Sequence, residues 1–219
     1  MIFDMHVHTK LSGDSSATVE DYCRAIQRYR AFYPFDGIVI TEHRMYRGPE
    51  AYKQIGEKYG VVILQGIEVN ADLGHLLLYG VTDRFLNRFD ISSLRLESRA
   101  VIEAMDAYGG IAVPAHPFRE SRYGKMLGLN EDRLSGITVI EERNGSNTSE
   151  QNRKAEELVT ENGLKGIGGS DAHYANRHWF LNCATEFDDE IETIEDMVAA
   201  LRHGSYRPIS LNGSVLEDF

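Results

Sequence analysis

The sequence predicts an α/β fold in which strands and helices alternate around a mostly parallel sheet. Short apolar runs of strand length recur along the 219 residues, and amphipathic stretches of helix length separate most of them. About seven strand-then-helix units favour a closed or nearly closed barrel over an open sheet. No fixed-period repeat, low-complexity tract or linker interrupts the chain, so we expect a single domain over residues 1–219.

Strands are expected where short apolar or β-branched runs are bounded by turn residues. The first is Ile2–His6, and the second, Gly37–Thr41, has the continuous apolar character of a buried strand. A turn at Asn70–Gly74 separates the third strand from the fourth. The remaining expected strands, in chain order, are Val61–Val69, His75–Val81, Gly110–Pro114, Gly136–Glu141, Lys165–Gly169 and a last one near Arg207–Leu211.

Helices are expected between these strands. In Thr18–Phe32, Thr18 is placed to cap the helix and Asp21 follows three residues later, which resembles a capping box. A second helix, Thr148–Glu161, is followed by Asn162-Gly163, a typical C-terminal cap. The other expected helices are Pro49–Tyr59, Ser92–Tyr108 and a last one with the buried face Ile194, Met197, Val198 and Leu201, while Phe118–Arg133 is expected to be a loop.

The composition argues against several classes of protein. A net charge of −11 counts against broad electrostatic binding to nucleic acid or to anionic membranes, although bound divalent cations would offset part of it. The longest apolar runs, such as Gly60–Leu64, are far too short to cross a bilayer, and the first residues do not resemble a signal peptide. Cys23 and Cys183 belong to no Cys-x-x-Cys pair. We therefore expect a cytoplasmic protein with reduced cysteines.

The start of the chain carries the first functional signal. If Ile2–Val7 is a strand, side chains alternate between its faces, and Asp4, His6 and His8 project on one side. Neighbouring imidazoles suit a divalent metal, and a carboxylate on the same face can support such a site. Two surface histidines on an exposed strand are the simpler alternative, and the remaining histidines decide between the two interpretations.

Histidines recur in short motifs at the ends of the expected strands, where barrel enzymes build their active sites. The chain has 8 histidines, and Glu68 also ends an expected strand. His203 is expected to be a cation at a helix C-terminus. The motifs are His6 and His8, Thr41-Glu42-His43, Gly74-His75, Ala115-His116-Pro117 and Ser170-Asp171-Ala172-His173.

These motifs, in this order, resemble the PHP (polymerase and histidinol phosphatase) family of metallohydrolases over nearly the whole chain. Each motif is weak alone, but the ordered set is specific. The resemblance implies a distorted seven-stranded (β/α)7 barrel, TIM-barrel-like, with three divalent metal ions (zinc, manganese or iron) at its mouth. The motifs that carry it are Asp4-Met5-His6-Val7-His8-Thr9, Ser12-Gly13-Asp14-Ser15, Ile40-Thr41-Glu42-His43, Gly66-Ile67-Glu68-Val69, Gly74-His75, Ala115-His116-Pro117 and Gly169-Ser170-Asp171-Ala172-His173.

The resemblance also implies which residues hold each metal. The first metal position would be formed by His6, His8, Glu68 and Asp171, the second by Glu68 as a bridge with His75 and His116, and the third by Asp14, His43 and His173. Asp14 stands in a loop that varies within the family, and its alternative role is a turn or helix-capping aspartate. Glu42 stands where many members have Asp, next to a ligand, so we expect it to affect orientation. Asp4 is expected to support the ligands from behind.

The implied activity is hydrolysis of a phosphate monoester by a metal-bound hydroxide next to Glu68 and Asp171. The substrate would be a small phosphorylated metabolite such as histidinol phosphate, a nucleotide or a sugar phosphate. Arg119 and Arg143 are candidates for holding phosphate because the guanidinium fork matches two oxygens, although each has a surface ion pair as its alternative. Arg177 and His178 follow the last histidine motif, and His178 is a candidate acid for the leaving oxygen.

Other functions stay open at this level. A nuclease or polymerase-associated exonuclease is disfavoured but not excluded by the acidic charge. A phosphotyrosine phosphatase, an amidohydrolase and a metal-stabilised scaffold without turnover are further alternatives. The oligomeric state is unknown; tyrosines in the expected helix Tyr22–Tyr33 are at best a hint of an interface.

Overall fold

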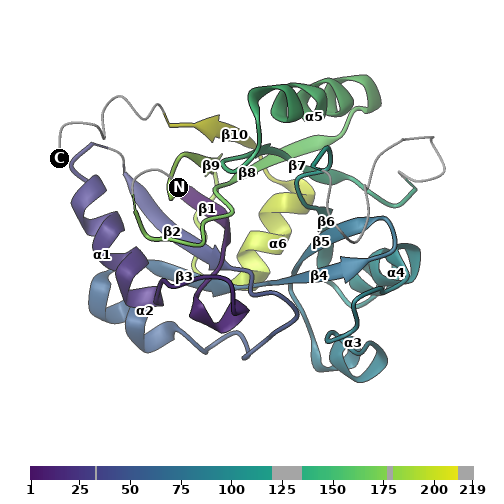
Figure 1. Ribbon diagram of the computed structural model, residues 1–219, viewed down its shortest axis with the longest axis horizontal. Coiled ribbons are helices and arrows are strands. Elements are labelled where there is room, and N and C mark those ends of the chain that lie inside the picture. Colours follow the sequence, from purple (N-terminus) through teal and green to yellow (C-terminus); the bar gives the residue numbers. More distant parts are fainter. Residues whose placement is uncertain (33, 120–134, 177–179, 212–219) are drawn as a thin grey trace.

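The computed structural model describes residues 1–32, 34–119, 135–176 and 180–211. Within these residues ten strands form three sheets, and six α-helices and a short 3-10 helix connect them (Figure 1). The strands are β1 (Ile2–Val7), β2 (Phe35–Ile40), β3 (Val62–Gln65), β4 (Ile67–Ala71), β5 (Gly74–Tyr79), β6 (Ile111–Pro114), β7 (Val139–Asn144), β8 (Lys165–Gly169), β9 (Cys183–Phe187) and β10 (Tyr206–Ser210).

The sheets are mixed, which corrects the expectation of a mostly parallel closed sheet. The largest has the order β10-β9-β1-β2-β3, the second β4-β5-β6 and the third β7-β8. Strands β1, β2 and β3 are parallel, as are β7 and β8, but β5 is antiparallel to both β4 and β6. Only Asp72 and Leu73 separate β4 from β5, and so short a connection joins antiparallel strands. Among the described residues no ladder joins β6 to β7, so a closed seven-stranded barrel is not observed.

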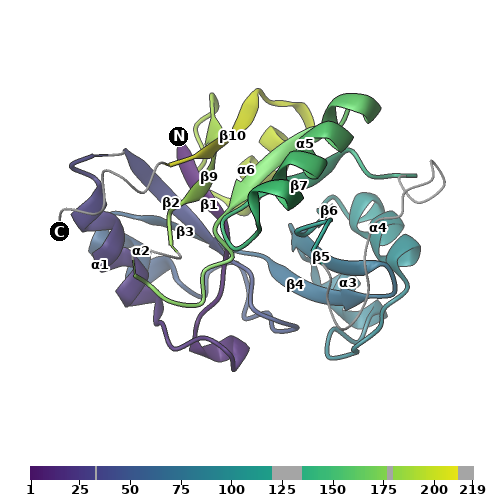
Figure 2. The ribbon, with the colours of Figure 1, turned by 45° about the horizontal axis from the view of Figure 1, so that its top comes forward.

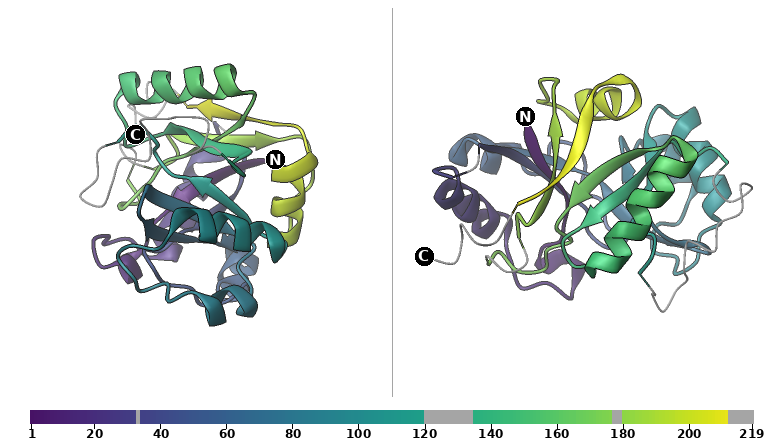
Figure 3. Two further views of the ribbon diagram at one scale, coloured as in Figure 1. Left: turned by 90° about the vertical axis from the view of Figure 1, so that its right-hand side faces the viewer. Right: turned by 90° about the horizontal axis from the view of Figure 1, so that it is seen from above.

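The three sheets nevertheless share one apolar core. Its buried residues come from every sheet and from α6 (Ile194–His203), which lies between the five-stranded and three-stranded sheets (Figure 1). Figure 2 and Figure 3 show the same arrangement from other directions, with the sheets turned toward one another. The predicted apolar face of the last helix belongs to this core. Representative members are Phe3, Met5, Val39, Leu77, Val113, Val139, Ile167, Met197 and Leu201.

The helices mostly begin where their capping residues predict. Thr18 and Asp21 form the expected capping box at the start of α1, and Gly163 ends α5 in a left-handed conformation with φ of 62°. Helix α5 contacts β7 and β8, and α4 contacts β6. The helices are η1 (Lys10–Ser12), α1 (Val19–Tyr29), α2 (Lys53–Tyr59), α3 (Asp83–Arg88), α4 (Ser98–Ala107), α5 (Ser149–Asn162) and α6.

Several boundaries differ from the sequence predictions. The expected strand Val61–Val69 is divided at Gly66 into β3 and β4, while α3 and β9 were not predicted at all. Gly66 N–H donates to the carbonyl of Ile40, and a Cβ at Gly66 would lie 2.7 Å from the carbonyl oxygen of Leu78. Glycine is therefore required where the chain passes from one sheet to the next. Most of the expected loop Phe118–Arg133 falls outside the described residues.

The structure also bears on the expectations about membrane spans and cysteines. Among the described residues, no helix combines the length and the apolar character that crossing a membrane requires. Cys23 and Cys183 are both buried and are free thiols.

Candidate metal centre

The residues predicted to hold metals all come together at one edge of the sheets. At this edge β1, β2 and β8 end, and β4 begins just beyond β2. His75 differs from the other histidines in that it lies at the start of a strand and not at its end. Since β5 runs back antiparallel over β4, His75 Nδ1 lies 2.8 Å from Glu68 Oε1. The gathered residues are His6, His8, Asp14, His43, Glu68, His75, His116, Asp171 and His173.

The two histidines of the opening motif face each other across the first metal position. His6 Nε2 and His8 Nε2 are 3.0 Å apart, and both imidazoles are buried. Glu68 Oε2 lies 3.5 Å from the first nitrogen and 3.2 Å from the second. Asp171 Oδ1 lies 3.5 and 3.4 Å from the same two nitrogens. Two imidazoles and two carboxylates therefore converge on one point, as the resemblance implied.

Glu68 stands at the middle of the cluster. Its Oε1 lies 2.8 Å from His75 Nδ1 and 3.1 Å from His116 Nε2, which are the other members of the second metal position. Its Oε2 faces the first position and also lies 2.8 Å from His43 Nδ1. The Glu68 carboxylate thus turns one oxygen toward the first metal position and the other toward the second, as a bridging ligand requires.

The third predicted group is more open to solvent. Asp14 Oδ2 lies 3.2 Å from His43 Nε2 and 3.4 Å from His173 Nε2. The Asp14 side chain is 53% exposed, whereas Glu68 is almost completely buried. Asp14 is thus within reach of both histidines, on the side of the cluster from which a substrate can approach.

Unusual backbone conformations hold two of these residues in place. His116 has a backbone φ of 28° and Asp171 one of 55°, values that residues other than glycine rarely adopt. The Asp171 N–H donates to the His6 carbonyl at 2.7 Å, and the His116 N–H donates to Glu141 Oε2 at 2.6 Å. Such strain persists where the surroundings fix it, and it concentrates at functional sites.

The charges in the cluster are strongly coupled. Burial alone would lower the pKa of His8, but the hydrogen bonds and charges of Asp171 and Glu68 outweigh it and raise that pKa to about 9. The pKa of His6 is also raised, against its burial, by Asp171, Glu141 and Glu68. Burial would raise the pKa of the Glu68 and Asp171 carboxyl groups, yet the surrounding cationic groups hold both well below their usual range. A positive charge is therefore needed between these carboxylates.

The donor set fits divalent metal ions. Glu68 Oε2 is buried and has no hydrogen-bond partner among the described residues, although three imidazole nitrogens lie 2.8–3.5 Å away. Two histidine nitrogens that face each other at 3.0 Å cannot both be satisfied without a shared proton or a cation. Imidazole and carboxylate without thiolate suit zinc, manganese or iron, and the residue types do not choose among them.

Two polar residues behind the ligands, Glu141 and Asn70, were not predicted from the sequence. Glu141 on β7 is fully buried and lies 2.9 Å from His6 Nδ1. Asn70 Nδ2 lies 3.0 Å from His75 Nε2. Glu42 accepts hydrogen bonds from Thr9 N–H and Ser12 Oγ, so it fixes the loop after β1, in line with its expected orienting role. Glu141 could have been found from the sequence, because it follows the apolar run Val139-Ile140 at the end of an expected strand, just as Glu68 ends an expected strand.

Asp4 also lies behind the ligands, as expected. Its Oδ1 accepts hydrogen bonds from the backbone N–H groups of Ser170 and His6 at 2.8 and 3.2 Å. Burial raises the pKa of this carboxyl to about 7, against those hydrogen bonds. Asp4 therefore holds the β1 and β8 ends together and does not reach the point where His6 and His8 converge.

The two predicted arginines have different surroundings. Arg119 donates to Asp171 Oδ2 at 2.5 Å and also to Asn144 and Asn147, so it stands at the rim of the cluster. Arg143 instead contacts Glu142, Glu156 and Ser210, none of which belongs to the cluster. The contacts of Arg143 in this structure therefore lie outside the cluster, where a bulge after Glu141 shifts the alternation of side chains along β7, and its part in holding phosphate stays a prediction.

The last predicted catalytic residue, His178, lies outside the described residues, as does Arg177.

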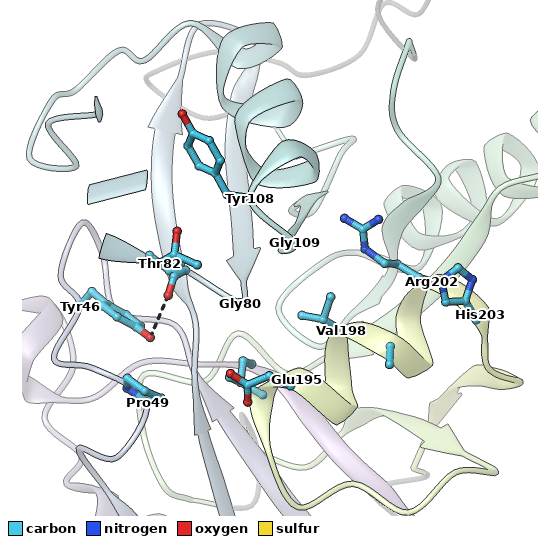
Figure 4. A pocket seen from close by; sticks show the side chains of 13 residues that line it. Tyr46, Pro49, Gly80, Thr82, Tyr108, Gly109, Glu195, Val198, Arg202 and His203 are labelled. Atoms are coloured by element: carbon cyan, nitrogen blue, oxygen red, sulfur yellow. Dashed lines mark hydrogen bonds between the residues drawn. The ribbon is translucent and has the colours of Figure 1, made fainter. Parts of the chain in front are cut away.

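The cavities of the described chain are not largest at the cluster. A cavity of about 240 Å³ adjoins it, lined by Asp14, Ser146, Asp171, His173 and Tyr174. A larger one of about 380 Å³ lies between α6, the β5–α3 connection and the loop after His43 (Figure 4). Its walls contain one acid and one histidine, Glu195 and His203, at opposite ends of α6. Among the described residues, the lining of that larger cavity contains no cluster of metal-ligating side chains. The candidate site is therefore identified by its gathered histidines and carboxylates and not by the size of its cavity.

Comparison with known proteins agrees with this geometry. A family described as PHP-associated matches residues 149–206. An uncharacterized protein of Methanocaldococcus jannaschii, MJ1587, is 27% identical over 145 residues, which cover 63% of this chain and 80% of that protein. The match therefore extends well beyond the PHP-associated segment.

Solved structures share the fold at low sequence identity. A two-domain protein from Bacteroides vulgatus, containing a predicted PHP-like metal-dependent phosphoesterase, matches 96% of this chain with a TM-score of 0.69 and 18% identity. Endonuclease Q, solved with a 27-mer duplex carrying an abasic lesion at the active site, matches 97% with a TM-score of 0.70 and 16% identity. This chain spans 64% and 60% of those two chains, respectively. The fold that these structures share with this chain, and the PHP-associated segment, agree with the family that the order of its motifs resembles.

Proposed function

We propose that this protein is a metal-dependent phosphoesterase that hydrolyses the phosphate monoester of a small molecule. The single observation that carries the proposal is the convergence of six histidines and three carboxylates on adjoining points around Glu68. Divalent metals bound there would activate water near neutral pH and stabilise charge on the attacking and leaving oxygens of phosphoryl transfer. Three metals, as the resemblance implies, form part of the proposal.

The residues of the chain would position the reaction. Glu68 would keep the first two metal positions close to each other, and Asp171 would complete the first one beside the entering phosphate. Asp14, His43 and His173 line the exposed side, where the substrate enters. Tyr174 is 46% exposed beside the cavity of about 240 Å³ and offers an aromatic surface to the organic part of a substrate. A cavity of that size favours a small ester over a folded macromolecule.

Arg119 can serve two purposes at once. Three of the five N–H groups of a guanidinium are used by Asn147, Asp171 and Asn144. The two others can donate to a phosphate oxygen, and the side chain is 26% exposed. Arg119 would then orient Asp171 and hold the phosphate, whereas the ion pairs of Arg143 with Glu142 and Glu156 favour a supporting role for that side chain over contact with the phosphate.

The proposed function extends to the chain as a whole. We take residues 1–219 as one catalytic domain, since all three sheets contribute to one core. The sheets would together enclose a distorted barrel with the cluster at its mouth.

The direct test is to measure metals per chain and hydrolysis in the same preparation. We expect about three divalent ions per chain and hydrolysis of p-nitrophenyl phosphate faster than of its bis ester when manganese is supplied. A panel of phosphorylated metabolites and a phosphotyrosine peptide would then narrow the substrate. A preparation with full metal content that cleaves no phosphoester would contradict the proposal and leave the amidohydrolase and the non-catalytic scaffold.

A second candidate function is cleavage of nucleic acid, because endonuclease Q matches nearly the whole of this chain. Against it stand the net charge of −11 and the length of that protein that this chain does not span. Assaying a duplex with an abasic site beside the small monoesters separates the two. Strand cleavage at rates above those for any monoester would favour the nuclease.

A further inference from the structure

We infer that Glu141 is a positioning residue that fixes the tautomer of His6 and thereby sets the affinity of the first metal position. The inference rests on the metal centre of the proposed function, but it holds whatever ester is cleaved. Glu141 lies on β7, behind the ligands, with no solvent exposure. It reaches none of the points where the ligands converge, so it acts only through its neighbours.

Three donors converge on the two oxygens of Glu141. Its Oε1 lies 2.9 Å from His6 Nδ1. Its Oε2 accepts from the His116 backbone N–H at 2.6 Å and from Asn144 Nδ2 at 2.9 Å. Since the last two groups can only donate, Oε2 must be an acceptor. With Oε2 occupied by these two donors, Oε1 is the oxygen left to accept from His6, so His6 Nδ1 carries a hydrogen and donates it.

This hydrogen bond decides what the other nitrogen of His6 can do. In a neutral imidazole one nitrogen carries the hydrogen and the other has the lone pair. With the hydrogen held on Nδ1 by Glu141, the lone pair is on Nε2, which points at His8, Glu68 and Asp171. Nε2 is then ready to bind a metal, and its partner carboxylate also increases the basicity of the ring.

An amide at position 141 would have the opposite effect. Glutamine has nearly the same size as glutamate. Its amide oxygen would have to accept the hydrogen bonds from His116 N–H and Asn144 Nδ2, since both groups only donate. Its NH₂ group would then face His6 Nδ1 and could only donate to it. His6 would have to carry its hydrogen on Nε2, the nitrogen that faces the cluster, and would no longer bind a metal in the neutral state.

The surroundings leave Glu141 little freedom to avoid this outcome. Asn144 is itself held by Arg119, which donates to Asn144 Oδ1 at 2.5 Å. On the other side, a Cβ at Gly169 would lie 3.2 Å from Glu141 Oε1, so β8 packs directly against the carboxylate. The amide therefore has no room to swing away from His6.

The test compares Glu141→Gln with Glu141→Asp, and zinc alone is the probe. We expect Glu141→Gln to weaken zinc binding at the first position by 10-fold or more, a loss typical of such supporting carboxylates. The shorter aspartate keeps an acceptor on both oxygens, so Glu141→Asp should retain more affinity than Glu141→Gln. A role in packing alone predicts the reverse order, because glutamine matches glutamate in size.

A spectroscopic measurement checks the tautomer directly. In the zinc-loaded protein the His6 Nδ1–H should give a downfield proton signal, and this signal should be missing in zinc-treated Glu141→Gln. Glu142→Gln is the matched control, because Glu142 is the adjacent acid on β7 and contacts Arg143 outside the cluster. It should keep the signal and the zinc affinity of the unaltered protein.

Three results would overturn the inference. They are wild-type zinc affinity in Glu141→Gln, better binding by Glu141→Gln than by Glu141→Asp, and absence of the Nδ1–H signal in the unaltered loaded protein. If Glu141→Gln fails to fold, the signal in the unaltered protein and the Glu141→Asp affinity still decide. None of these readouts uses hydrolysis, so they stand apart from any failure of the proposed activity.

Discussion

At the residue scale, the metal centre depends most on Glu68. We expect Glu68→Gln to lose at least two metals per chain and nearly all hydrolysis. The reason is that one carboxylate faces His6 and His8 with one oxygen and His75 and His116 with the other. Metal analysis after exhaustive dialysis, followed by the phosphatase assay, measures both effects.

The matched control for Glu68 is Glu103→Gln, which changes an exposed acid that pairs with Arg99 on α4. It should keep full metal content, since exposed ion pairs contribute little. Retention of all metals by Glu68→Gln would show that Glu68 is not a bridging ligand.

Arg119 gives a second prediction at this scale. Arg119→Gln should raise KM for a phosphate monoester by about 10-fold or more, because a hydrogen bond to a charged group contributes roughly 1.5–3 kcal/mol. Metal content should change less than KM does, since Asp171 keeps its contacts to His6 and His8. Steady-state kinetics at fixed manganese measures the change.

Arg153→Gln is the comparison for Arg119, because Arg153 pairs only with acids of its own helix among the described residues. Equal KM values for Arg119→Gln and Arg153→Gln would remove Arg119 from the substrate site.

The residues that gather in the cluster were predicted from sequence, as were Asp4 and Glu42 behind them, but Glu141 and Asn70 were not. Histidine and acid motifs at strand ends identify His6, Glu68 and Asp171 because their chemistry is unusual at those places. Glu141 and Glu142 look alike in sequence, and only the strand register shows that the first faces His6 and the second faces away. The contacts of Arg143 could not be predicted for the same reason, since one bulge changes which side chains face the site.

At the element scale, the close approach of β8 to β1 brings Asp171 to the histidines. A Cβ at Gly169 would lie 2.6 Å from His6 Cβ and 2.8 Å from His6 N, so no side chain fits there. We expect Gly169→Ala to lower the free energy of unfolding by about 1–3 kcal/mol, the usual cost of overpacking, and to weaken zinc binding as well. Denaturant titration and zinc titration measure the two effects.

Gly163→Ala controls for the general cost of replacing a glycine. Gly163 ends α5 with φ of 62° and has no atom within 4 Å of its Cβ position, so alanine there costs backbone strain alone. That variant should lose stability without losing zinc affinity. If Gly169→Ala also kept full zinc affinity, the spacing of β1 and β8 would not control the site.

The elements themselves were predictable where local chemistry specifies them. The capping box at Thr18, the C-cap at Gly163 and the strand Lys165–Gly169 were all expected from local patterns. Helix α3 was missed because it spans six residues and buries only Phe85, too little for a helical period to appear. The expected strand Val61–Val69 reads as one apolar run, and its division at Gly66 depends on contacts with Ile40 and Leu78 from elsewhere in the chain.

At the scale of the whole molecule, the alternation of strands and helices predicted the class of fold but not the pairing of its strands. Sequence patterns describe each strand alone, whereas sheet closure depends on partners that are distant in sequence. Three sheets with separate ladders around one core place every ligand-bearing strand end at the same edge. The cluster can therefore form because these strand ends lie side by side, and it does not require a closed barrel.

The charge of the whole cluster leads to a prediction about pH and stability. The folded pKa of His8, about 9, is above its ordinary value of 6.5, and that of His6 is raised as well. A raised folded pKa contributes stability that is complete below 6.5 and is lost as the pH rises through about 9. The free energy of unfolding of the metal-free protein should therefore fall between these values, by up to about 1.4 kcal/mol per pH unit for each group. Chemical denaturation at a series of pH values after chelation measures it.

Metal should abolish this loss, because zinc requires the ligand histidines without their protons and replaces the positive charge that they supply to Glu68 and Asp171. The loaded protein should instead gain stability as the pH rises from 6 toward 8, since bound metal competes less with protons. Glu68→Gln, which removes one of the carboxylates that raise both pKa values, should show a weaker pH dependence when metal-free. A metal-free protein whose stability stays level from pH 6.5 to 9 would mean that the six histidines and three carboxylates do not form the coupled cation-requiring cluster described above.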